Sequence, residues 1–306
     1  MGLTGALAGR RDLVAFADEV GADGPVAVEG SRTRWSAGGE AAPGVRLVRA
    51  PSGVADYLPE EMVVCVGAGT TVAELASVLA SRGQRCALPE RGGTVGGAIA
   101  VGEQHLDVLA RGSLRASVLE VRYVSSEGRL VRGGGPTVKN VTGFDLPRLM
   151  TGALGTLGLL AEVILRTNPI PAASAWLRAD GADPFGAFDA LLHPSAVLWD
   201  GASTWVHLEG HPGDVAAQAA VASRLAPFAE VDGPPPLPAH RWSLEPSALR
   251  GLTGRFVASV GTGLVFRDEP QPPRPPDAAS LVVAARMKRE FDPPGRLNPG
   301  RDPARR

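Results

Sequence analysis

Cysteine is nearly absent from this sequence, which has only Cys65 and Cys86 among its 306 residues. With no further thiol and no histidine placed beside them, these residues predict neither a disulfide framework nor a zinc or iron–sulfur site. Unpaired thiols are typical of proteins from a reducing cytoplasm. We therefore predict no metal site and a cytoplasmic location.

An excess of charge of either sign is also missing, as is any long apolar run. The 31 basic and 32 acidic residues give a net charge of −1, so nothing in the composition attracts nucleic acid or an anionic membrane. No window approaches the ~18 uninterrupted apolar residues of a membrane span. Arg10, Arg11 and Asp12 do not fit a signal peptide. We expect no direct membrane span, and any membrane contact to be made through partner proteins.

The sequence does contain enough apolar residues for a folded core. Hydrophobic residues make up 44% of the chain and charged residues 21%, which is ordinary for a soluble globular protein. A chain of this length is expected to form about two domains. Pro169 and Pro171 mark the boundary, because closely spaced prolines favour extended chain and stop strand pairing.

Strands and helices are expected on both sides of this boundary. Before it, Thr71 and Glu74 form a capping-box pattern for a helix that ends at Gly83, and a strand over 118–125 returns as a hairpin over 129–132. After it, the expected strands are 173–177, 196–199 and 204–208, and the expected helices are 214–225 and 278–290. This order predicts α/β packing in the first part and a small α+β layer in the second.

A loop with two glycine pairs is the strongest single signal of a ligand site. Its sequence, over residues 89–100, is PERGGTVGGAIA. Glycine has no Cβ, so the main chain at Gly92, Gly93, Gly96 and Gly97 can take a positive φ and turn its N–H groups toward an anion such as a pyrophosphate. The alternative is a tight connection between two strands, and the loop alone does not separate the two interpretations.

A second glycine pattern, Gly67-Ala68-Gly69, follows a strand and opens a helix. It is similar in place to the dinucleotide fingerprint, and Glu90 lies about 20 residues further on, where an acidic ribose partner is expected. Val72 stands where the third glycine is required, and its side chain would push the helix away from the strand. A strand-to-helix turn is the better interpretation.

Five segments stand in a fixed order along the chain. They read VEGSRTRW from Val28, VVCVGAGTTVAELASVLASRGQ from Val63, PERGGTVGGAIA from Pro89, VKNVTGFDLPRLMTGALGTLGLLAEVIL from Val138 and FDPPGRLNPGR from Phe291. Together they resemble the vanillyl-alcohol-oxidase, or PCMH-type, FAD-binding family and, within it, the FAD-binding subunits of bacterial glycolate oxidases. The fourth segment is the most specific of the five.

The resemblance implies a fold and a division into domains. The fold is α+β, with a PCMH-type FAD-binding domain of two α/β subdomains and a small α+β cap domain. We predict the FAD-binding domain over residues 1–171 and the cap over residues 172–277. Residues 278–306 are expected to form a C-terminal helix and a segment that returns to the FAD-binding domain.

The resemblance also implies noncovalent FAD, because no histidine stands in the first phosphate loop. Residues 30–33 would wrap one side of the diphosphate with backbone N–H groups, a hydroxyl and a guanidinium, and residues 92–97 would close the other side. Gly67–Gly69 then becomes scaffold, and Ile164 would line the cofactor with its backbone. The expected cofactor-binding residues are Gly30, Ser31, Arg32, Thr33, Pro89, Gly92, Gly93, Thr94, Gly96, Gly97, Ala98 and Ile164.

The implied reaction is oxidation of a 2-hydroxy acid, with glycolate or D-lactate as the usual substrates of the family. The flavin would accept a hydride, and electrons would pass to an iron–sulfur subunit, since this chain has no cysteine cluster of its own. A catalytic flavoprotein subunit is a further expected partner. The resemblance also admits a different class of function, a noncatalytic flavin-binding or assembly subunit of such a complex.

Departures from the wider family support this alternative and leave the catalytic residues unassigned. The histidines are the natural candidates for a general base, but His211-Pro212-Gly213-Asp214 is followed by Val215, which breaks the metal and base motif of the catalytic relatives. His207 and Glu209 share a strand face and are interpreted as a structural pair. The remaining histidines, His105, His193 and His240, lie in no recognisable motif.

Overall fold

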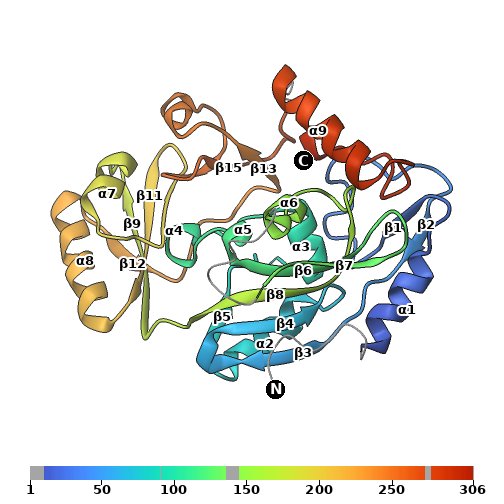
Figure 1. The fold of residues 1–306 in the computed structure, drawn as a ribbon. Helices are drawn as coiled ribbons and strands as arrows, with labels where there is room; N and C mark the ends of the chain where they lie inside the picture. Colours follow the sequence, from blue (N-terminus) through green and yellow to red (C-terminus); the bar gives the residue numbers. More distant parts are fainter. Residues whose placement is uncertain (1–9, 90, 136–144, 273–276, 306) are drawn as a thin grey trace. The chain divides into compact units, whose positions relative to one another are not determined.

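The computed structural model describes residues 10–89, 91–135, 145–272 and 277–305, and the chain divides into two compact units (Figure 1). Unit 1 consists of residues Met1–His105, Ser113–Pro169 and Arg274–Arg306. Unit 2 consists of Leu106–Gly112 and Ile170–Pro273. The long segment of unit 2 begins directly after Pro169, next to the proline pair. The short segment 106–112 joins unit 2 although the chain on both sides of it belongs to unit 1.

Unit 1 is built around a six-stranded sheet whose strand pairs are all antiparallel. Its strands are β3 (Val54–Leu58), β4 (Val63–Gly67), β8 (Leu159–Pro169), β6 (Val118–Val124) and β7 (Leu130–Gly134) in spatial order, with β5 (Gln84–Cys86) paired to the end of β8. β8 lies between β4 and β6, and residues 159–165 of this strand are all buried. The apolar run in this part of the sequence therefore forms the centre of the sheet.

Short helices pack on this sheet around one apolar core. The core joins residues of β4, β6 and β8 to residues of α2 (Val72–Ala80), α3 (Val95–Val101), α5 (Leu114–Ser117) and α6 (Leu146–Met150). The predicted capping box of α2 is confirmed, because Glu74 N donates to Thr71 Oγ1 at 3.1 Å and Thr71 N donates to Glu74 Oε2 at 2.9 Å. The helix ends at Ala80, before the predicted Gly83. A single 3-10 turn, η2 (Pro59–Glu61), joins β3 to β4.

A smaller layer of unit 1 joins the two ends of the chain. It contains α1 (Arg11–Val20) and the parallel strands β1 (Val26–Val28) and β2 (Arg46–Val48). After α9 (Ala278–Phe291) the chain returns here, and Leu297 forms a parallel bridge with Val26. The buried Arg296 guanidinium donates to five carbonyl oxygens, those of Val20, Gly21, Asp23, Gly24 and Ser126. This guanidinium caps the open carbonyls at the end of α1, so the C-terminal segment is part of the fold of unit 1.

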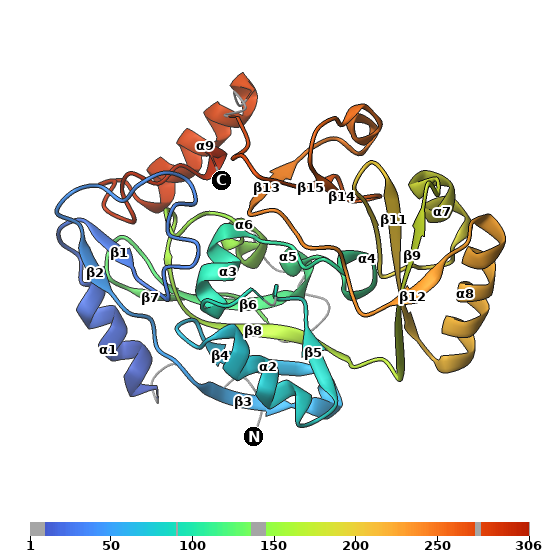
Figure 2. The ribbon, with the colours of Figure 1, turned by 180° about the vertical axis from the view of Figure 1, so that it is seen from behind.

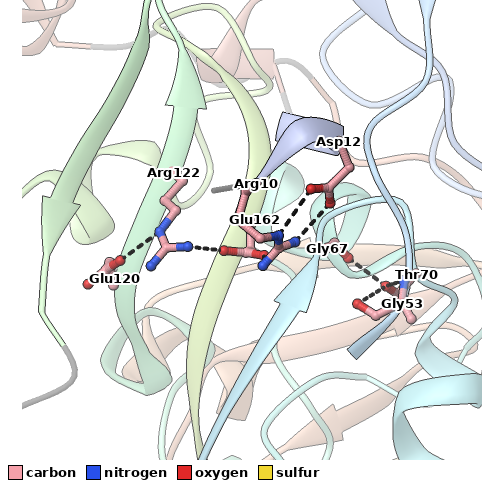
Figure 3. A network of polar contacts seen from close by, with 8 residues as sticks. All are labelled: Arg10, Asp12, Gly53, Gly67, Thr70, Glu120, Arg122 and Glu162. Atoms are coloured by element: carbon pink, nitrogen blue, oxygen red, sulfur yellow. Dashed lines mark hydrogen bonds and ion pairs between the residues drawn. The ribbon is translucent and has the colours of Figure 1, made fainter. Parts of the chain in front are cut away.

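Buried charges lie within the unit 1 sheet (Figure 3). Glu162 on β8 is fully buried, and its carboxylate pairs with Arg122 on β6 and, at 2.6 Å, with Arg10 just before α1. Arg122 also donates to Glu120 at 3.0 Å, and Glu120 accepts from Arg132 at 2.7 Å. Two buried carboxylates are thus shared among three guanidiniums. Burying a charge is tolerated only when partners compensate it, so each member depends on the others.

Unit 2 contains a seven-stranded antiparallel sheet. Its strands, in spatial order, are β12 (Ala229–Val231), β9 (Ala173–Asp180), β11 (Ser203–Gly210), β10 (Ala196–Trp199), β14 (Val257–Ser259), β15 (Leu264–Arg267) and β13 (His240–Ser243). The other elements are α4 (Val108–Arg111), α7 (Pro184–Ala190), α8 (Pro212–Leu225) and the 3-10 helix η3 (Pro246–Gly251). α7 and α8 lie on one face of the sheet (Figure 2), where they share an apolar core with β9 and β11.

The predicted fold class is confirmed, since both helices and strands are present in the expected order. The strand predicted over 118–125, the three strands predicted in the second part and the two later helices are all found, with ends shifted by a few residues. Among the described residues, no helix has both the length and the apolar content needed to cross a bilayer.

Replacing Glu162 by alanine tests the buried network. The change leaves the Arg122 guanidinium without its partner on β8, and removing one member of a buried ion pair costs about 3–5 kcal/mol. We expect the free energy of unfolding, measured by urea denaturation, to fall by this amount. Glu61→Ala is the control, because this exposed residue forms no ion pair among the described residues and surface changes stay within about 0.5 kcal/mol. Equal stabilities for the two variants would contradict the role of the network.

The two cysteines provide a second test. Cys65 and Cys86 are free and buried, and burial, with the nearby Glu162 carboxylate, raises the pKa of Cys65 to about 12. The thiolate is the reactive form, so we expect no reaction of the native protein with Ellman's reagent at mildly alkaline pH. Both thiols should react after unfolding in guanidinium. Rapid reaction of the native protein would show that the β4 region opens to solvent.

Candidate functional site

A pocket in unit 1 brings together four segments that lie far apart in the sequence. It is lined by the loop after β1, by residues around the start of α3, by the turn before β8 and by the C-terminal segment. The space between the lining atoms measures about 870 Å³, part of which is open to solvent.

The loop after β1, residues 30–34, offers backbone donors to the pocket. Among the described residues, none of its N–H groups donates a hydrogen bond, although Glu29 N before it donates to Val48 O and Trp35 N after it donates to Arg32 O. Arg32 has a φ of +56°, a left-handed conformation that costs a non-glycine residue roughly 1 kcal/mol. Consecutive N–H groups in such a turn form a concave donor surface for an anion.

Arg34 adds a charged donor to this surface. Its guanidinium pairs with the Glu103 carboxylate, and the two side chains are only 6% and 4% exposed. Nη1 donates to Gly92 O at 2.8 Å, whereas Nη2 is buried and has no hydrogen-bond partner among the described residues. A buried donor without a partner costs about 1–3 kcal/mol, and an anionic ligand in the pocket would remove this cost.

The glycine pairs of the 89–100 loop differ from each other in conformation. Gly92 and Gly93 have φ values of +70° and +85°, as glycine permits. Gly96 and Gly97 lie in α3, and their N–H groups are already paired, with Ala68 O at 2.8 Å and Thr94 Oγ1 at 3.2 Å. The expectation that all four glycines turn N–H groups toward an anion is therefore wrong for the second pair. The alternative of a connection between two strands is also wrong, since the loop leads into a helix.

The second glycine pair provides space instead. A Cβ on Gly96 would lie 2.8 Å from Ala68 Cβ, so this glycine allows α3 to approach the turn after β4. A Cβ on Gly97 would meet only Thr94 Oγ1, at 3.1 Å, and Gly97 lines the pocket. Gly30, across the pocket, would meet the same Thr94 hydroxyl at 2.7 Å if it carried a Cβ. The loop after β1 and the start of α3 are thus in contact, and Gly30 leaves no room for a Cβ between them.

The structure gathers most, but not all, of the predicted cofactor-binding residues at the pocket. Those that line it are Gly30, Ser31, Arg32, Thr33, Thr94, Gly96 and Gly97. Those that do not are Pro89, Gly92, Gly93, Ala98 and Ile164. Gly93 lies directly behind the first loop, where a Cβ would be 2.4 Å from Thr33 Oγ1, and Ile164 is buried among apolar side chains of β4.

The Gly67–Gly69 turn has two roles. A Cβ on Gly67 would lie 2.5 Å from Pro51 O, so this glycine is required by close packing, as a scaffold turn predicts. Gly69, in contrast, lines the pocket.

Glu90, Lys139, Asn140 and Phe144 lie outside the described residues. Asp145 is the N-cap residue of α6, where its side chain accepts from Arg148 N at 3.1 Å.

Many of the pocket residues were not among the predicted site residues, and Arg34, Asn298 and Arg301 are three of them. Asn298 N donates to Val26 O at 2.7 Å, and its side-chain amide donates to Leu154 O. The Arg301 guanidinium lies 4.8 Å from the ring centroid of Trp35, which also contacts Arg32 at 5.1 Å. The FDPPGRLNPGR segment was the available signal for Asn298 and Arg301, but only folding shows which of its side chains reach the pocket.

The charges at the pocket favour an anion. Arg32, Arg34 and Arg301 contribute three guanidiniums, and Glu29 contributes one carboxylate. A hydrogen bond from Arg32 lowers the pKa of Glu29 below its ordinary value, so this carboxylate is ionised at neutral pH. Burial lowers the pKa of Arg301, yet a guanidinium remains charged in proteins. The excess of positive charge suits a diphosphate.

The histidines His207 and His211 lie in unit 2. His207 Nε2 lies 3.9 Å from Glu209, as the shared strand face predicts, and its Nδ1 lies 2.7 Å from Asp107, which the sequence did not connect with it. His211 is the N-cap residue of α8, where its Nδ1 accepts from Gly213 N at 3.3 Å. The residues His211–Asp214, which superficially resemble the metal and base motif of the catalytic relatives, thus form the start of a helix.

Comparison with known proteins shows which family part of the chain matches and which solved structures have a similar fold. The model of the FAD binding domain family matches residues 10–134, so this part of the chain is an FAD binding domain and FAD is its cofactor. A solved alkyldihydroxyacetonephosphate synthase superposes with a TM-score of 0.68 at 12% identity, covering 94% of this chain and 73% of that protein. At this identity the likeness concerns the fold, which is that of the PCMH-type FAD-binding proteins.

Two relatives with higher sequence identity are named oxidoreductases or subunits of one. The chain is 32% identical over 203 residues to glycolate oxidase subunit GlcE of Escherichia coli (strain K12), which covers 63% of this chain and 58% of that protein. It is 32% identical over 114 residues to D-lactate dehydrogenase of Archaeoglobus fulgidus, covering 36% of this chain and 25% of the enzyme. The chain thus aligns with less than two thirds of the length of these relatives. The resemblance inferred from the five segments is confirmed.

Proposed function

We propose that this chain is the FAD-binding subunit of an oxidoreductase that acts on a 2-hydroxy acid such as glycolate or D-lactate. The observation that carries the proposal is the donor set of the pocket: N–H groups over residues 30–34 and the Nη2 of Arg34, none of which has a partner within the described part of the chain, inside the segment that matches the FAD binding domain family. The names of the relatives, a glycolate oxidase subunit and a D-lactate dehydrogenase, support the substrate class.

The residues of the pocket fit the diphosphate of FAD. We assign the N–H groups of residues 30–33 and the guanidinium of Arg34 to the phosphate oxygens, and Thr94, Gly96 and Gly97 to the opposite wall. Pro89, Gly92, Gly93 and Ala98 are proposed to support this wall from behind, and Ile164 to place the backbone of β8. Because the wall contains no histidine, the cofactor is held noncovalently.

Bound FAD would supply the two-electron oxidation of the hydroxy acid, accepting a hydride and passing electrons on to an iron–sulfur partner. The residues of this chain bind and orient the cofactor, and the arginines neutralise its diphosphate. We propose residues 1–171 as the FAD-binding domain, 172–277 as the cap and 278–306 as the returning segment. A catalytic flavoprotein subunit and an iron–sulfur subunit are the proposed partners of a complex that works in the cytoplasm, with any membrane contact made through those partners.

A second candidate function is a noncatalytic flavin-binding or assembly subunit. The observation that favours it is the position of His211, which caps α8 and is not part of a metal and base motif. The two functions share the FAD site and differ in whether a hydroxy acid reduces the bound flavin.

Gly97→Ala tests the pocket. The added methyl meets only Thr94 Oγ1, so the fold should persist while the methyl enters the space proposed for the cofactor. We expect the affinity for FAD to fall about tenfold or more, which corresponds to ~1.4 kcal/mol. Quenching of flavin fluorescence on addition of FAD to flavin-free protein measures this affinity. Gly233→Ala is the matched control, because its Cβ would meet nothing within 4 Å. Equal affinities would place the flavin elsewhere.

Anaerobic reduction separates the two candidate functions. We expect the purified chain to be yellow and its flavin absorbance to bleach when glycolate or D-lactate is added. A yellow protein that neither acid bleaches, alone or with its partner subunits, would instead favour the noncatalytic role. A colourless protein that gains no flavin absorbance on incubation with FAD would contradict both.

A further inference from the structure

The sheet of unit 2 places four polar or aromatic side chains on one of its faces. In the register of β9 and β11, His207 lies opposite Trp176, and Glu209 lies opposite Ser174. Directly opposite residues of antiparallel strands share a face, and so do residues two apart along one strand, so all four side chains point to the same side. Asp107, the N-cap residue of α4, belongs to the same unit and reaches this face from outside the sheet.

Asp107, His207 and Ser174 form a continuous hydrogen-bonded chain. Asp107 Oδ1 lies 2.7 Å from His207 Nδ1, and His207 Nε2 lies 2.9 Å from Ser174 Oγ. The imidazole is stacked on Trp176, with ring centroids 4.3 Å apart and planes 6° from parallel. Arg111 Nη2 lies 3.2 Å from the second oxygen of Asp107. Each group except the serine is therefore fixed by at least two contacts.

The three hydrogen-bonded side chains differ in exposure, as a reactive site requires: the carboxylate and the imidazole are buried and the nucleophile is accessible. Asp107 and His207 are only 4% and 5% exposed, whereas Ser174 is exposed to solvent. When Nδ1–H donates to the Asp107 carboxylate, Nε2 carries the lone pair and accepts from the serine hydroxyl. This is the arrangement in which a buried carboxylate orients an imidazole that acts as the general base for an accessible nucleophile.

We propose that Ser174, His207 and Asp107 form a second reactive site that hydrolyses small carboxylic esters, apart from the FAD site. Ser174 Oγ attacks the ester carbonyl, its proton moves to His207 Nε2, and the alcohol leaves with that proton, so an acyl-serine is formed. A water molecule then attacks the acyl-serine, again giving its proton to Nε2, and the carboxylic acid and the free serine are restored. Ser174 and His207 are the catalytic residues, and Asp107 is a positioning residue.

The surrounding charge indicates which esters fit. Glu209 Oε1 lies 3.9 Å from His207 Nε2, beside the nucleophile. This carboxylate stabilises the imidazolium that forms during the reaction and repels a negatively charged substrate. The site therefore favours neutral or cationic esters, in contrast to the anionic hydroxy acids proposed for the oxidoreductase reaction. General-base catalysis of this kind contributes about 10²–10⁴-fold in rate.

Covalent labelling of the intact chain tests the nucleophile. We expect a fluorophosphonate probe to modify Ser174, as located by peptide mass spectrometry, and p-nitrophenyl acetate to be hydrolysed. Ser174→Ala should lose the label and lower the hydrolysis rate at least 100-fold, which is the lower end of the general-base contribution. Ser223→Ala is the control, since this exposed serine on α8 donates to the Ala219 carbonyl and has no further hydrogen bond within the described ranges. Absence of label, or a label on another residue with Ser174→Ala fully active, would overturn the proposal.

Two further variants separate positioning from a purely structural role. Asp107→Asn should lower kcat for p-nitrophenyl acetate while KM stays within twofold, because the amide disturbs the orientation and charge of the imidazole and leaves the exposed serine in place. His207→Gln should abolish both label and hydrolysis. An unchanged far-UV circular dichroism spectrum and an unchanged midpoint of urea denaturation show that the Ser174→Ala variant is folded. Unchanged kcat in Asp107→Asn would contradict the role given to the carboxylate.

Discussion

The buried carboxylate of Glu162 is the constraint on which the architecture of unit 1 depends. It lies on β8, the strand that pairs directly with β4, β5 and β6. A charge at this position is stable only because Arg122 comes from the neighbouring strand and Arg10 from the residue before α1 (Figure 3). The sheet and the start of the chain are thereby held to one strand, whose first residues, Leu159 and Leu160, also line the pocket.

The buried charges at the pocket differ from those of the sheet, because one of their donor groups has no partner among the described residues. Glu103 holds the Arg34 guanidinium in place but leaves Nη2 without a partner among the described residues, and the neighbouring backbone adds N–H groups in the same condition. The left-handed conformation of Arg32 adds a local cost. These are expensive features in a folded protein, and a bound diphosphate would offset them. For the proposed binding of FAD these donor groups are already in place, which reduces the ordering that binding requires.

Local signals in the sequence predicted local structure well. Thr71 and Glu74 predicted the start of α2, because a capping box depends on contacts within three residues. The structure of the glycine loop over residues 89–100 was harder to predict. Its glycines identified the right segment, yet the N–H groups of Gly96 and Gly97 are paired, and the Ala68 carbonyl that pairs the first of them lies on a distant turn. Propensity and spacing contain no information about such partners.

By itself, the amino-acid sequence determined the fold class, because five segments in a fixed order resemble the PCMH-type FAD-binding family, and it determined the scarcity of cysteine, which follows from composition. Tertiary structure alone decided which atoms face the pocket and which groups meet across the sheets. Arg34 meets Glu103, Asn298 meets Leu154, and Asp107 meets His207 in unit 2 only once distant segments pack together. The physical reason is that hydrogen bonds and ion pairs are short-ranged, whereas the chain positions that make them lie up to 144 residues apart.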